Sequence, residues 1–182
     1  YDEGEDYWPK RYAIWGSLIA AQPEQAAFAI LDAKVNDKFI PSIFKSISAD
    51  TIPELAAMID VPGKVLENTI NSFNQSIVTG VYNIDELDGC HTVGITPAKS
   101  HWALPINMSP YYAYPLRPGI SFTYFGAKVD ASARVHFADS PSDNIFAAGE
   151  IMAGNILDKG YCAGTGMTIG GVFGRIAGGG AA

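Results

Sequence analysis

The feature that most constrains how this chain can fold is a set of glycines that recurs every four residues near its C-terminal end. The set consists of Gly166, Gly170, Gly174 and Gly178. A period of four places all of them on one side of a helix, where no side chain projects. Glycine inside a helix costs about 1 kcal/mol relative to alanine, so this face needs a structural or functional reason.

Two explanations of the glycine face are open. In the first, the helix packs closely against a strand or a second helix. In the second, the N-terminus of the helix points its positive end at an electron-rich group, through free amides at Gly166, Met167 and Thr168. The two explanations are compatible, and the spacing does not choose between them.

The segment in front of this helix predicts a strand followed by a loop. Ile145–Ala148 is a short apolar run typical of a buried strand, and it ends at Gly149 and Glu150. Such a strand delivers the Glu150 carboxylate at its C-terminal end. The loop beyond it is rich in glycine, so its backbone can take positive φ and lie against a ligand. Its glycines include Gly154, Gly160 and Gly164.

Composition places the chain among folded proteins of one or two domains. It has 182 residues, 48% of them hydrophobic, and a net charge of −7. This charge, without a lysine and arginine cluster, argues against nucleic acid and anionic lipid surfaces as partners. Cys90 and Cys162 lack metal-ligand or haem-attachment spacing, which favours free thiols in a reducing cytosol. We therefore expect no metal site, and the interrupted apolar runs predict no transmembrane helix.

The rest of the sequence predicts a mixture of helices and strands. A short helix should end near Gln22-Pro23, and Phe28–Asp32 should be a strand. Thr51 and Glu54 have the spacing of a capping box for a helix reaching about Asp60. A helix opened by Pro62 should stop at Gly80.

The second half predicts mainly strands. Residues 81–119 should be a long structured connection, followed by strands at Ile120–Asp130 and Ala133–Phe137 joined by a turn. A boundary near Pro105 then separates an α+β unit, residues 1–105, from a β-rich segment that ends in one helix, residues 106–182.

Two stretches resemble a known family. NIFAAGE, a glycine-rich loop and GTGMTIGGVFGRIAG resemble the C-terminal FAD-binding segment of the fumarate reductase and succinate dehydrogenase flavoproteins. Within that family, GEIMAGNILDKGYCAGTGMTIG and YDEGEDYWPKRYAIWG are similar to the tricarballylate dehydrogenase branch, some of whose members are labelled precorrin-3B synthase-like. The resemblance covers essentially the whole chain but only the C-terminal part of such a protein.

The resemblance implies a fold and a cofactor. Residues 1–105 would be the capping domain, and residues 106–182 the returning strands and helix of a Rossmann-like FAD-binding domain. The Gly-x-Gly-x-x-Gly turn of that domain would precede Tyr1, so the FAD site would be incomplete here. The start at Tyr1 rather than Met agrees with a processed chain or a fragment. Without its upstream packing partner, the glycine face would be exposed and the piece should self-associate.

The resemblance also assigns roles to residues. The helix N-terminus at Gly166–Thr168, approached through Gly164, would face the flavin pyrimidine ring, and Glu150 beside Gly149 would accept hydrogen bonds from ribityl hydroxyls. Otherwise Glu150 is a solvated carboxylate at a strand end. Arg11, which follows an Asp2-Glu3 pair, would handle the substrate proton, unless it is a surface arginine paired with Glu5 or Asp6.

The chain departs from the fumarate reductase pattern where substrate carboxylates would bind. Phe122-Thr123 stands in place of the family's histidine, and its late-loop arginine is also missing. Replacement anion contacts could come from Lys159 and Tyr161, and from His101 with Arg117. Each has a structural alternative, because a lone histidine is more often structural and a lone arginine is often a solvated surface residue. His91 and His136 are expected to be structural or at the surface.

These observations lead to a functional hypothesis with two rivals. The chain would be part of an FAD-dependent dehydrogenase that oxidises a small anionic polycarboxylate, tricarballylate, to cis-aconitate. Electrons would pass to a membrane-associated iron–sulfur protein, and the enzyme would be cytoplasmic, or peripheral at the membrane through that partner. One rival is a precorrin-3B synthase-like flavoprotein of cobalamin synthesis, which needs a wide apolar pocket. The other is a non-catalytic binding or interaction module.

Overall fold

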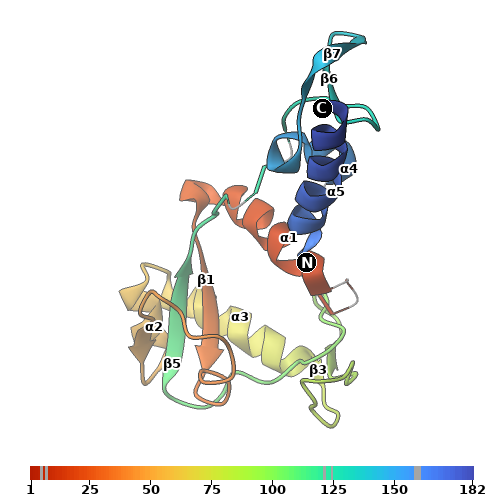
Figure 1. Ribbon diagram of the computed structural model, residues 1–182. Coiled ribbons are helices and arrows are strands. Elements are labelled where there is room, and N and C mark those ends of the chain that lie inside the picture. The colour runs from red at the N-terminus through yellow and green to blue at the C-terminus, as the bar shows by residue number, and fades with distance from the viewer. Residues whose placement is uncertain (5, 7, 121, 124, 158–160) are drawn as a thin grey trace. The chain divides into compact units, whose positions relative to one another are not determined.

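A computed structural model describes residues 1–182 except 5, 7, 121, 124 and 158–160 (Figure 1). The chain divides into two compact units. The first unit comprises Tyr1–Asp6 and Ile19–Arg117, and the second comprises Tyr7–Leu18 and Pro118–Ala182. This division falls at Arg117 rather than near Pro105, because the strand that ends at Leu116 belongs to the sheet of the first unit.

The first unit is built on a three-stranded antiparallel sheet of order β1-β5-β2. Its strands are β1 (Ala27–Asp32), β2 (Ile47–Ala49) and β5 (Tyr111–Leu116). The central strand β5 pairs with both neighbours, with Ala113 opposite Ile30 on one side and Ile47 on the other.

Two helices pack against this sheet, α2 (Ile52–Met58) and α3 (Gly63–Ser76) (Figure 1). The expected capping box starts α2: the Glu54 amide donates to Thr51 Oγ1, and the Thr51 amide donates to Glu54 Oε2. Leu55 and Ala113 are fully buried in the core between them, with Ile30 and Leu66 packed around them. Alternating apolar positions on the strands and one apolar face of α3 therefore meet in one core.

The remaining elements of the first unit are short. They are a 3₁₀ turn, Pro23–Gln25, and the strands β3 (Ile77–Val78) and β4 (His91–Thr92), which pair antiparallel. Helix α3 therefore ends at Ser76, short of Gly80, because the next two residues join β4. Strand β1 confirms the strand expected at Phe28–Asp32. Residues 81–119 contain β4 and β5, whereas the sequence predicts a long structured connection there.

The second unit combines one hairpin with helices. Helix α1 (Trp8–Ala20) begins within it, and α5 (Thr165–Gly180) ends it. Between them lie β6 (Arg134–Phe137), β7 (Ser140–Phe146), the 3₁₀ helix η2 (Gly149–Met152) and the short α4 (Gly154–Leu157). Strands β6 and β7 pair antiparallel. The predicted turn before β6 is present, with the Asp130 carboxylate accepting from the Ser132 and Arg134 amides.

One strand prediction for this unit was wrong, and a second was right only in part. The described residues of 120–130 form no strand beyond a bridge from Val129 to Val135. Their backbone bonds partly to β6, where the Asp130 amide donates to Arg134 O at 3.2 Å, and partly to the region after β7. There the Ala127 amide donates to Ile151 O at 2.7 Å, and the Val129 amide to Asn155 Oδ1 at 3.2 Å. The strand expected at Ile145–Ala148 is the end of β7, and Ile145 is 45% exposed rather than buried.

Helices and antiparallel sheets thus make up the described chain, in agreement with the α+β prediction. None of the helices in the described residues has the length and apolar character that crossing a bilayer requires.

Candidate cofactor site

The site is built around the start of α5. Gly164 precedes the helix in the left-handed conformation, with φ of 85°, which glycine adopts without strain. The turn is closed by Thr165, whose amide and hydroxyl both donate to Cys162 O, at 3.2 and 2.5 Å. The first amides of a helix have no acceptor within it, and the Met167 side chain is 88% exposed. The positive end of α5 is therefore accessible to a ligand.

The glycine face of α5 has two different halves. A Cβ at Gly166 would lie 3.0 Å from Phe122 Cε2, and one at Gly170 would lie 4.0 Å from Gly149 Cα. For Gly174 and Gly178, no heavy atom of the described residues lies within 4 Å of such a Cβ. Close packing therefore explains Gly166, whereas a Cβ at Gly170 would make only an ordinary van der Waals contact. Within the described part of the chain, close packing does not explain Gly174 and Gly178.

Glu150 is held near the start of η2 by one neighbour. Its Oε1 accepts from the Thr123 amide at 3.0 Å and from the Thr123 hydroxyl at 3.1 Å. Glu150 itself is exposed. The two bonds fix the orientation of the carboxylate while it stays accessible, so it can accept hydrogen bonds from a ligand.

An aromatic pair lies beside the start of α5. The Phe122 and Tyr161 rings have centroids 4.6 Å apart, at an interplanar angle of 36°. Both face Gly166, because a Cβ there would lie 3.0 Å from Phe122 Cε2 and 3.6 Å from the Tyr161 hydroxyl oxygen. Tyr161, a predicted substrate contact, therefore lies next to the predicted cofactor contact Gly166.

A small core fixes this arrangement. Met152 and Ala153 of the η2 region are fully buried and pack with Ile169 of α5. Asn155 adds polar support, since its Nδ2 donates to Ala127 O and Met152 O, both at 2.8 Å. The segment that carries Glu150 is thereby fastened to the helix that carries Gly166.

The other predicted site residues have different surroundings. In the first unit, His101 Nδ1 accepts from the Gly89 amide at 3.0 Å, and Arg117 Nη1 donates to Glu24 O. These contacts suit structural roles, and their anion-binding roles remain predictions. Lys159 lies outside the described residues. Arg11 is half-buried on α1, and its role in proton transfer also remains a prediction.

Asp2, from the acidic pair ahead of Arg11, anchors the N-terminal segment. Its Oδ1 accepts from the Ser100 amide and hydroxyl, each at 3.1 Å, and from the Gly4 amide. Burial by itself raises the pKa of Asp2, but these hydrogen bonds hold it below its usual value. The carboxylate thus serves as a structural acceptor between the chain start and the segment after β4.

Sequence reasoning missed the two residues that hold Glu150 and its segment. In the sequence, Thr123 stands out only as part of a departure from a family pattern, and Asn155 carries no functional signal. A hydroxyl beside an aromatic and an asparagine after glycine are common in turns, so neither gives a specific signal. Among the described residues, no three side chains gather in a way that could hold a metal ion.

The site fits the pyrimidine end of a flavin. That end is rich in carbonyl and nitrogen acceptors and gains negative charge on reduction, so it suits a helix N-terminus. The amides of Gly166 and Met167 would contact it, and Glu150 would accept from the ribityl hydroxyls.

Comparisons with known proteins agree with this fit. The family described as FAD binding domain matches residues 11–169. The chain is 29% identical over 175 residues to a probable fumarate reductase, Ifc3, of Shewanella frigidimarina, covering 90% of this chain and 27% of that protein. It is 35% identical over 111 residues to an NADH:acrylate oxidoreductase of Vibrio harveyi, covering 59% of this chain and 10% of that protein. It is 32% identical over 139 residues to a 4-oxocyclohexanecarboxylate 2-dehydrogenase of Sinomonas cyclohexanicum, covering 68% and 22%.

Solved structures show the same relationship. An open conformation of a flavocytochrome c3 fumarate reductase matches with a TM-score of 0.62 and 25% identity, over 91% of this chain and 28% of that one. A 3-ketosteroid Δ1-dehydrogenase from Sterolibacterium denitrificans shares the fold, with a TM-score of 0.69 and 22% identity over 91% of this chain and 34% of that one. The chain thus spans about a third or less of each of these relatives. It belongs to the FAD-binding domain family, in the superfamily that includes the fumarate reductase flavoproteins, and its cofactor is FAD.

Proposed function

We propose that the whole protein is an FAD-dependent oxidoreductase that removes or adds a pair of hydrogens across a C–C bond next to a carboxylate or carbonyl group. The observation that carries this proposal is the open N-terminus of α5, beside an oriented Glu150 carboxylate. The names of the relatives support it, since fumarate and acrylate both have a C=C bond next to a carboxylate.

The residues of this chain would do three things in such a reaction. FAD, when bound, supplies the centre that accepts or donates a hydride. The α5 amides would stabilise negative charge at the pyrimidine end, and Glu150 would orient the cofactor. The Phe122 and Tyr161 rings would keep water from this region. A base must also move one proton, and Arg11 is our candidate.

A polycarboxylate is the first candidate substrate, with tricarballylate oxidised to cis-aconitate. The sequence resemblance at both ends of the chain supports it. Carboxylate contacts would come from Lys159, Tyr161, His101 and Arg117. Phe122 occupies the position of the family's histidine, which makes fumarate itself a poorer candidate.

A cyclic ketone is the second candidate substrate. The aromatic pair of Phe122 and Tyr161 favours it, because two rings at the helix start suit an apolar ring better than a third carboxylate. The 32% identity to the 4-oxocyclohexanecarboxylate enzyme supports the same choice.

One experiment tests the cofactor and the substrate class together. The full-length protein is scanned for flavin absorbance, and then mixed without oxygen with tricarballylate, succinate or 4-oxocyclohexanecarboxylate. Bleaching by one of them identifies the class. A flavin that none of them bleaches removes these substrates, and a colourless full-length protein overturns the proposal.

The role of Arg11 has its own test in the full-length enzyme. We expect Arg11→Ala to lower kcat by a factor of about 100 or more, as for loss of an acid–base group, with FAD content unchanged. Lys64→Ala, which removes an exposed cation on α3, is the control. Near-normal turnover of Arg11→Ala would remove Arg11 from the mechanism.

We also propose how the FAD domain is completed, where the electrons go and where the enzyme is located. The second unit would complete a Rossmann-like FAD domain with preceding residues. Electrons would pass to a membrane-associated iron–sulfur protein from a cytoplasmic enzyme. Rapid flavin reduction by NADH alone would contradict this route, and the name of the acrylate relative makes NADH the right competitor to test.

A further inference from the structure

The loop between β1 and β2 carries apolar side chains that almost nothing in the described chain covers. Ile40 is 90% exposed, Ile43 is 95% exposed and Phe44 is 73% exposed. They lie within residues 38–45, KFIPSIFK, which we name the apolar tip. Large apolar side chains that cluster at the surface of a protein usually mark an interaction site.

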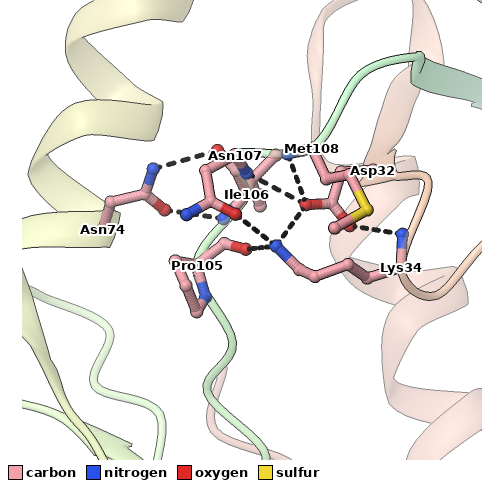
Figure 2. Close-up of polar contacts among 7 residues, drawn as sticks. All are labelled: Asp32, Lys34, Asn74, Pro105, Ile106, Asn107 and Met108. Carbon is pink, nitrogen blue, oxygen red and sulfur yellow. Dashed lines mark hydrogen bonds and ion pairs between the residues drawn. The ribbon is translucent and has the colours of Figure 1, made fainter.

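The base of this loop is fastened to the first unit. The Phe39 ring stands edge-on to Tyr114 of β5, with centroids 5.4 Å apart, and the Tyr114 hydroxyl donates to Asn36 Oδ1 at 2.8 Å. Lys34 Nζ bonds to Asp32 and to Pro105 O, both at 2.6 Å (Figure 2). These contacts hold the base of the loop against the first unit.

The charge of the apolar tip is opposite to that of the chain. Lys38 and Lys45 flank it, no acidic residue lies between them, and the chain as a whole carries −7. The Lys38 ammonium lies 5.9 Å from the centroid of the Tyr82 ring. Lys45, Ser42 and Ser46 line an open pocket of about 500 Å³, together with Asp37 and the tip residues Phe39, Pro41 and Phe44. Asp37 offsets one of the two lysines, so residues 37–45 carry a net charge of +1.

This combination suits a lipid surface better than a protein. A stable protein interface buries roughly 800 Å² on each partner and uses 20 to 30 residues, whereas the apolar tip is a short loop. Aromatic and aliphatic side chains enter the boundary between headgroups and acyl chains, while nearby lysines interact with anionic headgroups. The net charge of the chain argues against such a surface, but a local cation pair acts within a Debye length, about 10 Å.

We propose that the apolar tip docks the protein directly on a phospholipid bilayer that contains anionic headgroups. Ile40, Ile43 and Phe44 enter the interface, and Lys38 and Lys45 contact the phosphate groups. No other protein is required for this contact. It is independent of the proposed oxidoreductase activity, since none of these residues belongs to the candidate cofactor site.

Vesicle flotation of the full-length protein tests the proposal. We expect binding to phosphatidylcholine vesicles that contain 30% phosphatidylserine, and weaker binding to phosphatidylcholine alone or at high salt. The triple variant Ile40→Ser, Ile43→Ser, Phe44→Ser should lose at least about tenfold in affinity. Replacing Lys38 and Lys45 with alanine should cost a factor of about five for each lysine.

Matched controls distinguish vesicle binding through the apolar tip from binding through other exposed apolar side chains. Val81→Ser with Ile84→Ser removes two other exposed apolar side chains of the same unit, 88% and 57% exposed, and should leave vesicle binding unchanged. The added fluorescence of Ile43→Trp should be quenched by brominated lipid, and that of Val81→Trp should not.

Several results would overturn the proposal. They are no flotation of the wild type, equal flotation of the wild type and the triple variant, or attachment only to vesicles that already carry a membrane protein. The last result would assign the surface to a protein partner, and burial of the tip in the full-length protein would assign it to the rest of the same polypeptide. Flavin bleaching by substrate is measured separately, so failure here leaves the proposed function untouched.

Discussion

At position 126 only glycine fits, because the backbone there lies directly against another segment of the chain. A Cβ at Gly126 would lie 1.8 Å from Ile151 O and 2.6 Å from its carbonyl carbon. The Ala127 amide donates to that same oxygen at 2.7 Å. Neither backbone can move without losing this bond, so glycine is required at position 126.

We therefore predict that Gly126→Ala lowers stability by at least about 2 kcal/mol, since overpacking against backbone cannot relax cheaply. The control is Gly171→Ala on α5, where a Cβ meets nothing within 4 Å, and where alanine should stabilise by up to about 1 kcal/mol. Thermal unfolding of the full-length variants measures both. Equal melting temperatures for wild type and Gly126→Ala would contradict this packing.

Asp32 is the second residue whose role depends on contacts far along the chain. Only 2% of it is exposed, and its carboxylate accepts from the Lys34, Asn107 and Met108 amides as well as pairing with Lys34 Nζ (Figure 2). Burial by itself raises the pKa of Asp32, but the bonds from Lys34 and the two distant amides hold it below its usual value.

This lowered pKa predicts a pH-dependent contribution to stability. The contribution is complete above about pH 4, where an unfolded aspartate is ionised, and is lost as the pH falls further through the folded pKa. Asp32→Asn should cost roughly 2 kcal/mol at pH 7, and its deficit should shrink below pH 4. Thermal unfolding against pH measures this, with the exposed Asp139→Asn as control. A deficit that is constant with pH would show that charge is not involved.

At the scale of elements, α5 carries the site. Its exposed first turn is compatible with an added acid, because carboxylates near a helix N-terminus are favourable by 0.3–1 kcal/mol in general. Met167→Glu should therefore fold normally. A negative charge there opposes the negative charge that a flavin gains on reduction.

We predict that Met167→Glu weakens FAD retention and lowers the flavin midpoint potential by about 20 mV or more, equivalent to about 1 kcal/mol for two electrons. Met167→Gln has the same shape without the charge and should resemble the wild type. Spectroelectrochemical titration of the full-length protein provides the measurement. An unchanged potential in the glutamate variant would place the α5 N-terminus away from the flavin.

Elements also show where local sequence signals fail. Thr51, Glu54 and Pro62 predicted the starts of α2 and α3 correctly, because caps act over three or four residues. The alternation in Ile120–Asp130 predicted a strand wrongly, because the Ala127 and Val129 amides bond to Ile151 O and Asn155 Oδ1, and within the described residues only the end of the stretch bonds to β6. Strand β5 escaped prediction within a proline-rich segment, since only its partners β1 and β2 make it a strand.

At the scale of the whole molecule, the 182 residues expose a large apolar surface. Ile120 is 89% exposed, Phe125 is 96% exposed, and Met167 lies at the open helix end. The relatives are several times longer than the region they share with this chain, as the 27% coverage of the Shewanella protein shows. In those proteins further residues are available to cover such positions.

We predict that the 182-residue piece, prepared by itself, self-associates with rising concentration, and more so at high salt, where its net charge of −7 is screened. Static light scattering measures this, with the full-length protein as the comparison. A strictly monomeric piece at high concentration would contradict the prediction.

The sequence by itself determined the features that depend on near neighbours. The Gly166 period required a helix with a bare face, Thr51 and Glu54 required a cap, and the Gly149-Glu150 and Gly164–Thr168 stretches were enough to indicate a flavin family.

The tertiary structure decided the features that depend on distant residues. Thr123 orients Glu150, Phe122 and Tyr161 meet beside Gly166, and Asn107 and Met108 satisfy Asp32. Such pairings follow from how the chain folds back on itself, and no local pattern of residue types encodes them.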